Sequence, residues 1–152
     1  MLSRVADSLY WLGRYVERAE NLARMVEVTR RDALETFINQ IREDIWKPVI
    51  YATSLSNDLT QEQEDSIKED PAYYITLAEV NPMSIAACIS LARENARTVR
   101  DQLSEEMWLE LNSINLYMKS GKAARAYQSD PETLFRKIIR FSIIFQGLSQ
   151  ST

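Results

Sequence analysis

Apolar residues at the start of the chain recur at steps of three and four positions. Steps of this size return to the same side of an α-helix, so the pattern predicts one long helix over residues 3–35. Tyr10, Trp11 and Met25 lie off this stripe, which indicates a helix that is covered on more than one side. The stripe itself consists of Leu2, Val5, Leu9, Leu12, Val16, Ala19, Ala23 and Val26.

The following segment carries a weaker apolar repeat and then becomes polar. A second helix is predicted over residues 40–56, with Pro48 early in it, where a missing N–H matters least. Residues 56–70 are polar and acidic, so we expect a loop there, with one short helix after Thr60. Residues 71–79 predict another short helix. The core-facing positions of the second helix are Ile41, Ile45, Val49, Ala52 and Leu55.

Start signals divide the second half of the chain into three helices. Asn81-Pro82 and Asp130-Pro131 each combine an N-cap residue with a proline at the first helical position. Ser104 is a third N-cap residue, and two glutamates follow it in the first turn, where the helix dipole favours them. The predicted buried positions are Ile85, Ile89, Ala92, Ala96, Val99 and Leu103, then Trp108, Leu111, Ile114 and Met118, then Leu134, Ile138, Phe141 and Phe145.

Two glycines are predicted to end helices. Gly121 ends the helix that begins after Ser104, and Gly147 ends the last helix at about Gln146. Residues 122–128 form a short connecting segment. Together these signals predict an all-α fold, a helical bundle of four to five principal helices in one domain over residues 1–152.

Composition agrees with this fold class and restricts the partners. Only 3 glycines and 4 prolines occur in 152 residues, which disfavours a turn-rich β fold. The net charge of −4 argues against a general nucleic-acid surface. Charged residues interrupt every apolar run, so neither a signal peptide nor a membrane span is expected, and the prediction is a soluble cytoplasmic protein.

The chain contains no histidine and a single cysteine, Cys88. This excludes Ser-His-Asp and Cys-His catalysis and His-ligated zinc. Cys88 lies on an apolar stripe and is expected in the core, without an internal disulfide, as suits a reducing cytoplasm. No Gly-rich phosphate loop or metal-ligand spacing is present, so we expect no cofactor and no metal.

Two helical segments carry the same polar pattern of arginines and carboxylates at helical spacing. Such patterns either fix neighbouring helices or hold an anionic partner. We expect Arg93 and Arg100 to bond across to Glu17 or Glu20 and so tie the two helices together, although a merely solvated face stays the alternative. The candidate binding or inter-helix residues are Arg14, Glu17, Arg18, Glu20, Asn21 and Arg24, then Arg93, Glu94, Asn95, Arg97, Arg100 and Asp101.

Long stretches of the chain resemble a known bacterial family. MLSRVADSLYWLGRYVERAENLAR, the segment around Trp46, and NPMSIAACISLARENARTVRDQLSEEMW resemble the Alpha-E family, whose Glu-Arg motif matches Glu17-Arg18 here. Members of that family are usually longer and continue with further helices that carry a Glu-Arg motif of their own. This chain therefore resembles the N-terminal half only.

The resemblance implies a setting and leaves the activity open. Family members commonly accompany, or are fused to, ATP-grasp-like ligases and transglutaminase-like proteins, which implies peptide or amide-bond metabolism. The favoured hypothesis is a non-catalytic interaction module for such a partner. One alternative is a carboxylate- or phosphate-binding subunit or enzyme, with Glu17 or Glu94 as base; another is a purely structural oligomer. A homodimer is expected, because a half-length member leaves apolar surface uncovered.

Overall fold

The computed structural model describes residues 2–35, 42–53 and 58–150. These residues form eight α-helices and one short 3-10 turn, and no strand is present among them. The all-α class predicted from periodicity is therefore confirmed.

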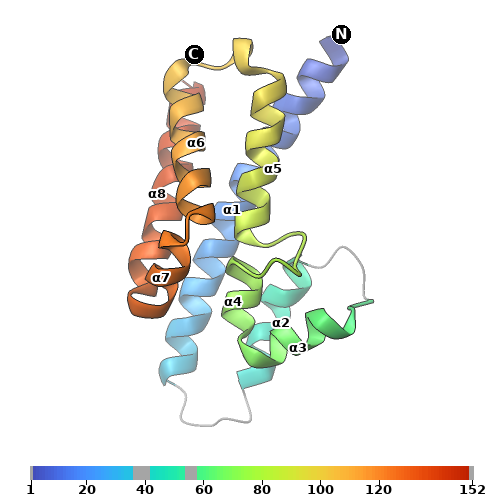
Figure 1. Ribbon diagram of the computed structural model, residues 1–152, viewed down its shortest axis with the longest axis vertical. Helices are drawn as coiled ribbons and strands as arrows, with labels where there is room; N and C mark the ends of the chain where they lie inside the picture. The colour runs from blue at the N-terminus through green and yellow to red at the C-terminus, as the bar shows by residue number, and fades with distance from the viewer. Residues whose placement is uncertain (1, 36–41, 54–57, 151–152) are drawn as a thin grey trace.

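Four long helices form the body of the molecule: α1 (Leu2–Glu35), α5 (Ile85–Thr98), α6 (Glu105–Lys119) and α8 (Pro131–Gln150). They pack in a ring, because α1 contacts α5 and α8, and α6 also contacts both of these. Figure 1 shows α6 and α8 side by side, with α5 in front of the middle of α1. This arrangement encloses one apolar interior.

The shorter helices pack around this ring. α2 (Arg42–Thr53) and α4 (Pro71–Thr76) both contact α1, and α3 (Gln61–Glu69) contacts α4. α7 (Lys122–Ser129) connects α6 to α8 and packs on both. In Figure 1, α2, α3 and α4 lie together at one side of the lower end of the bundle, and α7 lies at the other.

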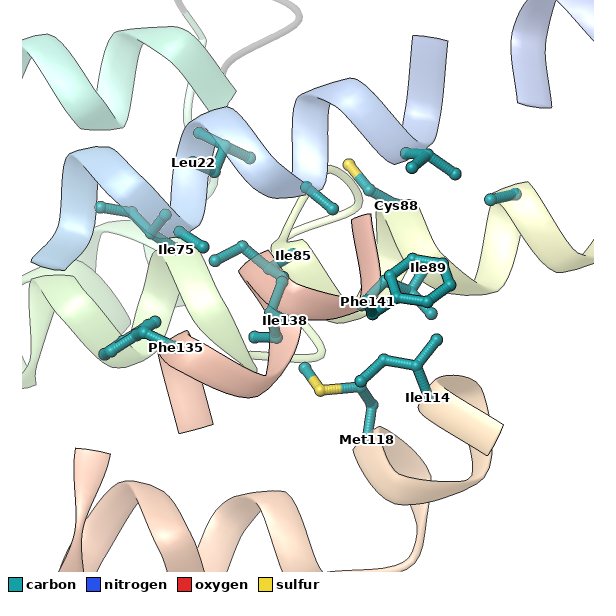
Figure 2. Close-up of a cluster of buried hydrophobic side chains, with 14 of the residues drawn as sticks. Leu22, Ile75, Ile85, Cys88, Ile89, Ile114, Met118, Phe135, Ile138 and Phe141 are labelled. Carbon is teal, nitrogen blue, oxygen red and sulfur yellow. The ribbon is translucent and has the colours of Figure 1, made fainter. Parts of the chain in front are cut away.

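The core draws its side chains from all four long helices and from α4. Figure 2 shows these side chains converging on one interior. Full burial of this many large apolar groups is the main favourable term in the stability of such a domain. The labelled members are Leu22, Ile75, Ile85, Cys88, Ile89, Ile114, Met118, Phe135, Ile138 and Phe141, all of which are buried.

Several predicted start and stop signals are confirmed. Ser104 caps α6 by accepting a hydrogen bond from the Met107 N–H, and Gly121 follows α6 with a φ of 87°, a left-handed conformation that favours glycine. Asp130 accepts a hydrogen bond from the Thr133 N–H at the start of α8. The short helix after Thr60 is α3, which begins with a capping box.

The prediction that Asn81 is the N-cap of the mid-chain helix is wrong. Ser84 caps α5 instead, accepting from the Ala87 N–H at 3.0 Å. Asn81 is buried in the preceding turn, where its amide donates to the Tyr74 carbonyl and its side-chain oxygen accepts from the Met83 N–H. An Asn-Pro pair suits a tight turn as well as a helix start, and tertiary burial decided between them.

Other boundaries also differ from the prediction. α5 ends at Thr98, and a 3-10 turn at Arg100–Gln102 follows it. Residues 122–128, predicted as a connecting segment, belong to α7. α8 continues through Gly147 to Gln150, and Leu148 packs on the core beyond the point where the glycine signal predicted an end. Trp108, predicted to be in the core, is only half-buried, and Met107 is buried instead.

The second predicted helix is confirmed over Arg42–Thr53, the part of residues 40–56 that the structure describes. Pro48 lies inside this helix, α2, and is exposed. Of its predicted core positions, Val49 is buried, Ile45 and Ala52 are half-buried, and the side chains of Ile41 and Leu55 lie outside the described residues. Within the described ranges, no helix has the length and apolar character needed to cross a membrane.

Candidate functional site

The Glu-Arg motif lies in the middle of α1, and its arginine donates a hydrogen bond to a neighbouring helix. Arg18 is half-buried and donates from Nη2 to the carbonyl of Ala52 at 3.1 Å. Ala52 belongs to α2, in which the hydroxyl of Thr53 also donates to the Ile50 carbonyl at 2.8 Å. Arg18 thus connects α1 to α2 through a hydrogen bond to the backbone.

Glu20, one turn from the motif, ties α1 to α8. Its Oε1 accepts from the Ser142 hydroxyl at 2.7 Å and from the Gln146 amide at 3.2 Å. Its Oε2 accepts from Arg24 Nε at 3.1 Å, and the Glu20 side chain is only 19% exposed. Ser142 is fully buried, so this carboxylate satisfies a hydroxyl that water does not reach.

The outer side of α1 carries the remaining members of the first stripe. Glu17 pairs with Arg14 at 3.6 Å, and the two side chains are 53% and 60% exposed. Asn21 is exposed beside them. An exposed pair of this kind within one helix contributes only a few tenths of a kcal/mol, about 0.3–0.5. Among the described residues, Glu17 therefore forms no ion pair or hydrogen bond with another helix.

The second stripe lies on α5 and the turn after it, facing α6. Arg93 donates from Nε to Asn112 Oδ1 at 2.8 Å, and its guanidinium lies 5.5 Å from the centre of the Trp108 ring. Arg100 lies over the same ring at 4.6 Å. Two cations on one indole, together with the hydrogen bond, connect α5 to α6.

The other members of the second stripe interact locally. Glu94 pairs with Arg97 at 3.2 Å and with Arg93 at 3.3 Å, both on α5. Asn95 donates to the Leu91 carbonyl one turn earlier. Asp101 is exposed after the end of α5.

The predicted bonds from Arg93 and Arg100 to Glu17 or Glu20 are not formed, and none of the ion pairs among the described residues joins α1 to α5. Arg93 of α5 and Arg100 of the 3-10 turn after it both lie against Trp108 of α6, whereas the small, fully buried Ala92 and Ala96 occupy the apolar side of α5. A hydrogen bond of 3.2 Å between Thr98 and Ser8 connects α5 to α1. The two stripes thus do not bond to each other. Each forms separate polar contacts with other helices, which we call ties.

Sequence reasoning missed the partners of these ties, namely Ser142, Gln146, Asn112 and Trp108. A signal exists for Ser142, which is a polar residue inside the apolar run of the last helix. The tie from Tyr127 of α7 was also missed: its hydroxyl donates to Asp70 at 2.7 Å, and its ring meets Tyr73 edge-on. Burial, and then this hydrogen bond, raises the pKa of Tyr127.

Cys88 lies in the core, as its apolar setting predicted. Burial raises the pKa of its thiol to about 11, and the positive charge of Arg18 opposes this shift. A buried thiol with such a pKa is protonated at neutral pH, whereas the nucleophilic form of cysteine is the thiolate. In the described part of the structure, no three His, Cys, Asp or Glu side chains are grouped so as to hold a metal ion.

Comparison with known proteins places the chain in a family. Uncharacterized proteins of Mycobacterium bovis and Mycobacterium tuberculosis are 30% identical to it over 141 residues, which covers 84% of this chain and 15% of each relative. No solved structure matches it. Residues 1–152 match Alpha-E, described as a predicted alpha-helical domain with a conserved ER motif, and Glu17-Arg18 is the one Glu-Arg dipeptide in the sequence. The chain belongs to the Alpha-E family.

Proposed function

We propose that this chain is a non-catalytic interaction module that binds a protein partner through the outer face of α1. The observation that carries the proposal is the unequal use of the Glu-Arg motif. Arg18 donates a hydrogen bond to α2 and so has a structural purpose, whereas Glu17 is exposed and, among the described residues, pairs with Arg14 of its own helix alone. A family motif that retains an exposed glutamate without a structural purpose points to binding.

The neighbours of Glu17 make this face suitable for a protein partner. Tyr10, Arg14, Asn21 and Arg24 are exposed and share the face with Glu17 at helical spacing. Trp11, 48% exposed, packs edge-on against Tyr10 beside them. Aromatic and arginine side chains are enriched in protein interfaces, because they combine a large contact area with directed hydrogen bonds.

Two further observations favour a binding module over an enzyme. The chain has no histidine, and its one thiol is buried in the core, so it offers neither an imidazole base nor an accessible thiol for acyl transfer. The chain also spans about 15% of the length of the curated relatives that it matches. In those proteins, a region like this one accompanies a much longer polypeptide, as an accessory module would.

The partner proposed here is an ATP-grasp-like ligase or a transglutaminase-like protein, the classes that the family resemblance implies. The setting is peptide or amide-bond metabolism, in which the partner supplies the chemistry. The alternative is a carboxylate- or phosphate-binding subunit or enzyme that uses both stripes, with Glu17 or Glu94 as base. It gives the exposed Glu94–Arg97 pair a direct role as well, and a matched substitution separates the two ideas.

The test compares two glutamates in equivalent local settings. Glu17 and Glu94 side chains are each 53% exposed, and each pairs with an arginine three positions away. Binding to a purified ATP-grasp-like or transglutaminase-like protein from the same genome is measured by calorimetry. Glu17→Gln is expected to weaken binding by about tenfold, whereas Glu94→Gln leaves it unchanged. The isolated chain is expected not to hydrolyse ATP.

Three results would contradict the proposal. Equal binding by Glu17→Gln and the parent protein would remove the α1 face from the interface. Loss of binding in Glu94→Gln alone would favour the anion-binding alternative. Turnover by the isolated chain that Glu17→Gln abolishes would make the protein an enzyme.

A further inference from the structure

The outer surface between α6 and α8 holds an open groove of about 450 Å³. Figure 1 shows the two helices side by side, and the chain reverses direction between them through α7. The apolar side chains of Ile114, Phe141 and Ile144 contribute to the lining of the groove, so its interior is not purely polar. The remaining lining residues are Glu110, Ser113, Thr133, Arg136, Lys137 and Arg140.

The groove is basic in a protein that is acidic overall. Arg136, Lys137 and Arg140 all come from α8 and face a single lining carboxylate, Glu110, whereas the net charge of the chain is −4. Within the described residues, none of these three cations forms an ion pair. Lys137 instead lies 4.2 Å from the centre of the Tyr117 ring. This contrasts with Arg14, Arg24, Arg93 and Arg97, each of which has a carboxylate partner.

Exposed apolar side chains border the same two helices. Leu109 and Leu116 lie one turn to either side of Ser113, and they are 58% and 67% exposed. Ile143, three positions after Arg140, is 54% exposed. Large aliphatic groups that adjoin a charged groove are typical of a surface that an amphipathic helix covers, with its apolar stripe against the aliphatic groups.

We propose that the α6–α8 groove binds an acidic amphipathic helix of a partner protein. The apolar stripe of that helix packs on Ile144 and Leu116, and its carboxylates pair with Arg136 and Arg140. The two arginines are four positions apart and so project from the same side of α8, which lets one helical ligand reach both. This surface is separate from the α1 face around Glu17, so the two sites are tested independently.

The experiment uses two synthetic helical peptides as probes. One has a leucine stripe flanked by glutamates, and the other is identical except that lysines replace the glutamates. Fluorescence anisotropy with the intact chain is expected to show binding of the acidic peptide, with an affinity that falls as salt is raised. The lysine peptide is expected to bind at least about tenfold more weakly.

Substitutions then assign the binding to the groove. The double substitution Arg136→Glu and Arg140→Glu is expected to weaken binding of the acidic peptide by about tenfold or more and to strengthen binding of the lysine peptide. Arg125→Glu, an exposed change on α7 outside the groove, is the matched control and is expected to leave both affinities unchanged. Ser113→Trp fills the groove without a change of charge and is expected to block the acidic peptide.

Several outcomes would overturn this proposal and leave the function proposed for the α1 face intact. These are failure of the acidic peptide to bind, binding that Ser113→Trp leaves unaffected, and an equal loss in Arg125→Glu. Duplex DNA or anionic vesicles that bind more tightly than the acidic peptide, with the same dependence on Arg136 and Arg140, would assign the groove to a different class of ligand. Circular dichroism of each variant verifies that it is folded.

Discussion

Glu17 and Glu20 lie three positions apart on α1, yet their environments differ sharply. Glu17 is exposed and pairs with one arginine of the same helix. Glu20 is largely buried and accepts hydrogen bonds from α8 as well as from Arg24. Position along a helix therefore separates a residue that is free to bind a partner from one that holds the bundle together.

Replacing these two residues provides a direct stability test. Glu20→Ala is expected to lower the free energy of unfolding by about 1–3 kcal/mol, because the buried Ser142 hydroxyl loses the acceptor of its proton and keeps only the bond that it accepts from Gln146. Glu17→Ala is expected to cost less than about 0.5 kcal/mol. Urea denaturation measures both, and losses of equal size would contradict this assignment.

Cys88 predicts how stability depends on pH. Burial raises its thiol pKa from 9.0 to about 11, so the unfolded chain ionises first as the pH rises. The contribution of the protonated, buried thiol to the free energy of unfolding is complete below about pH 9 and is lost as the pH rises through about 11. The free energy of unfolding of the parent protein is therefore expected to fall between about pH 8 and about pH 10.5. Replacing Cys88 with alanine is expected to make this fall smaller by about 1–2 kcal/mol.

Urea denaturation of the parent protein and Cys88→Ala at both pH values measures this difference. Tyr127 also has a raised pKa and contributes at alkaline pH in both proteins, so the comparison isolates the thiol. An identical pH dependence in the two proteins would show that Cys88 titrates normally, and hence that it is not buried in solution.

At the scale of elements, the start of α5 shows how burial selects between two local signals. Asn81 and Ser84 are both good N-cap residues, and they lie three positions apart. Asn81 is used in the turn, where its amide donates to the Tyr74 carbonyl, and Ser84 caps the helix. A turn residue and an N-cap residue at position 81 predict different effects of an aspartate there.

Asn81→Asp is expected to destabilise the protein by about 1–3 kcal/mol, because a carboxylate cannot donate to the buried Tyr74 carbonyl. An N-cap asparagine would tolerate the same change, since aspartate caps equally well. Ser84→Ala is expected to cost about 1 kcal/mol through loss of the cap. Thermal melts of both variants settle the matter, and an unchanged melt for Asn81→Asp would restore the original prediction.

At the scale of the whole molecule, each polar tie joins two packed helices or adjoining segments. Glu20 connects α1 to α8, Arg93 connects α5 to α6, and Arg18 connects α1 to α2. Tyr127 of α7 connects to Asp70, which caps α4. The apolar interior supplies most of the stability. We expect these ties to favour the observed pairing of helices over other pairings.

The uncovered apolar surface predicts self-association. Tyr10, Trp11 and Val28 of α1 and Tyr51 of α2 are large side chains that are each about half exposed or more. We expect a homodimer formed through this surface, and light scattering coupled to size exclusion measures it. Trp11→Glu is expected to yield a monomer with unchanged helicity. A parent protein that is monomeric at micromolar concentration would contradict the prediction, and a partner bound to the α1 face would compete with the dimer.

The sequence by itself determined the helical class, most helix starts and most of the buried positions, although Leu9 of the first predicted stripe is 37% exposed. Those features depend on residues three or four positions apart, so the spacing of Val16, Ala19 and Ala23, or the Ser104 cap, could be recognised without knowing the fold. The same holds for Cys88, whose apolar neighbours already placed it in the core.

Only the tertiary structure decided what the charged stripes contact. Glu20 and Ser142 are 122 positions apart, and no local pattern indicates that the final helix returns to α1 with a hydroxyl facing that carboxylate. The same reason explains the failed expectation for Arg93 of α5 and Arg100 of the turn after it, since both lie against Trp108 once α6 has packed. Periodicity gives the side of a helix on which a residue lies, whereas the neighbour on that side depends on how distant segments pack.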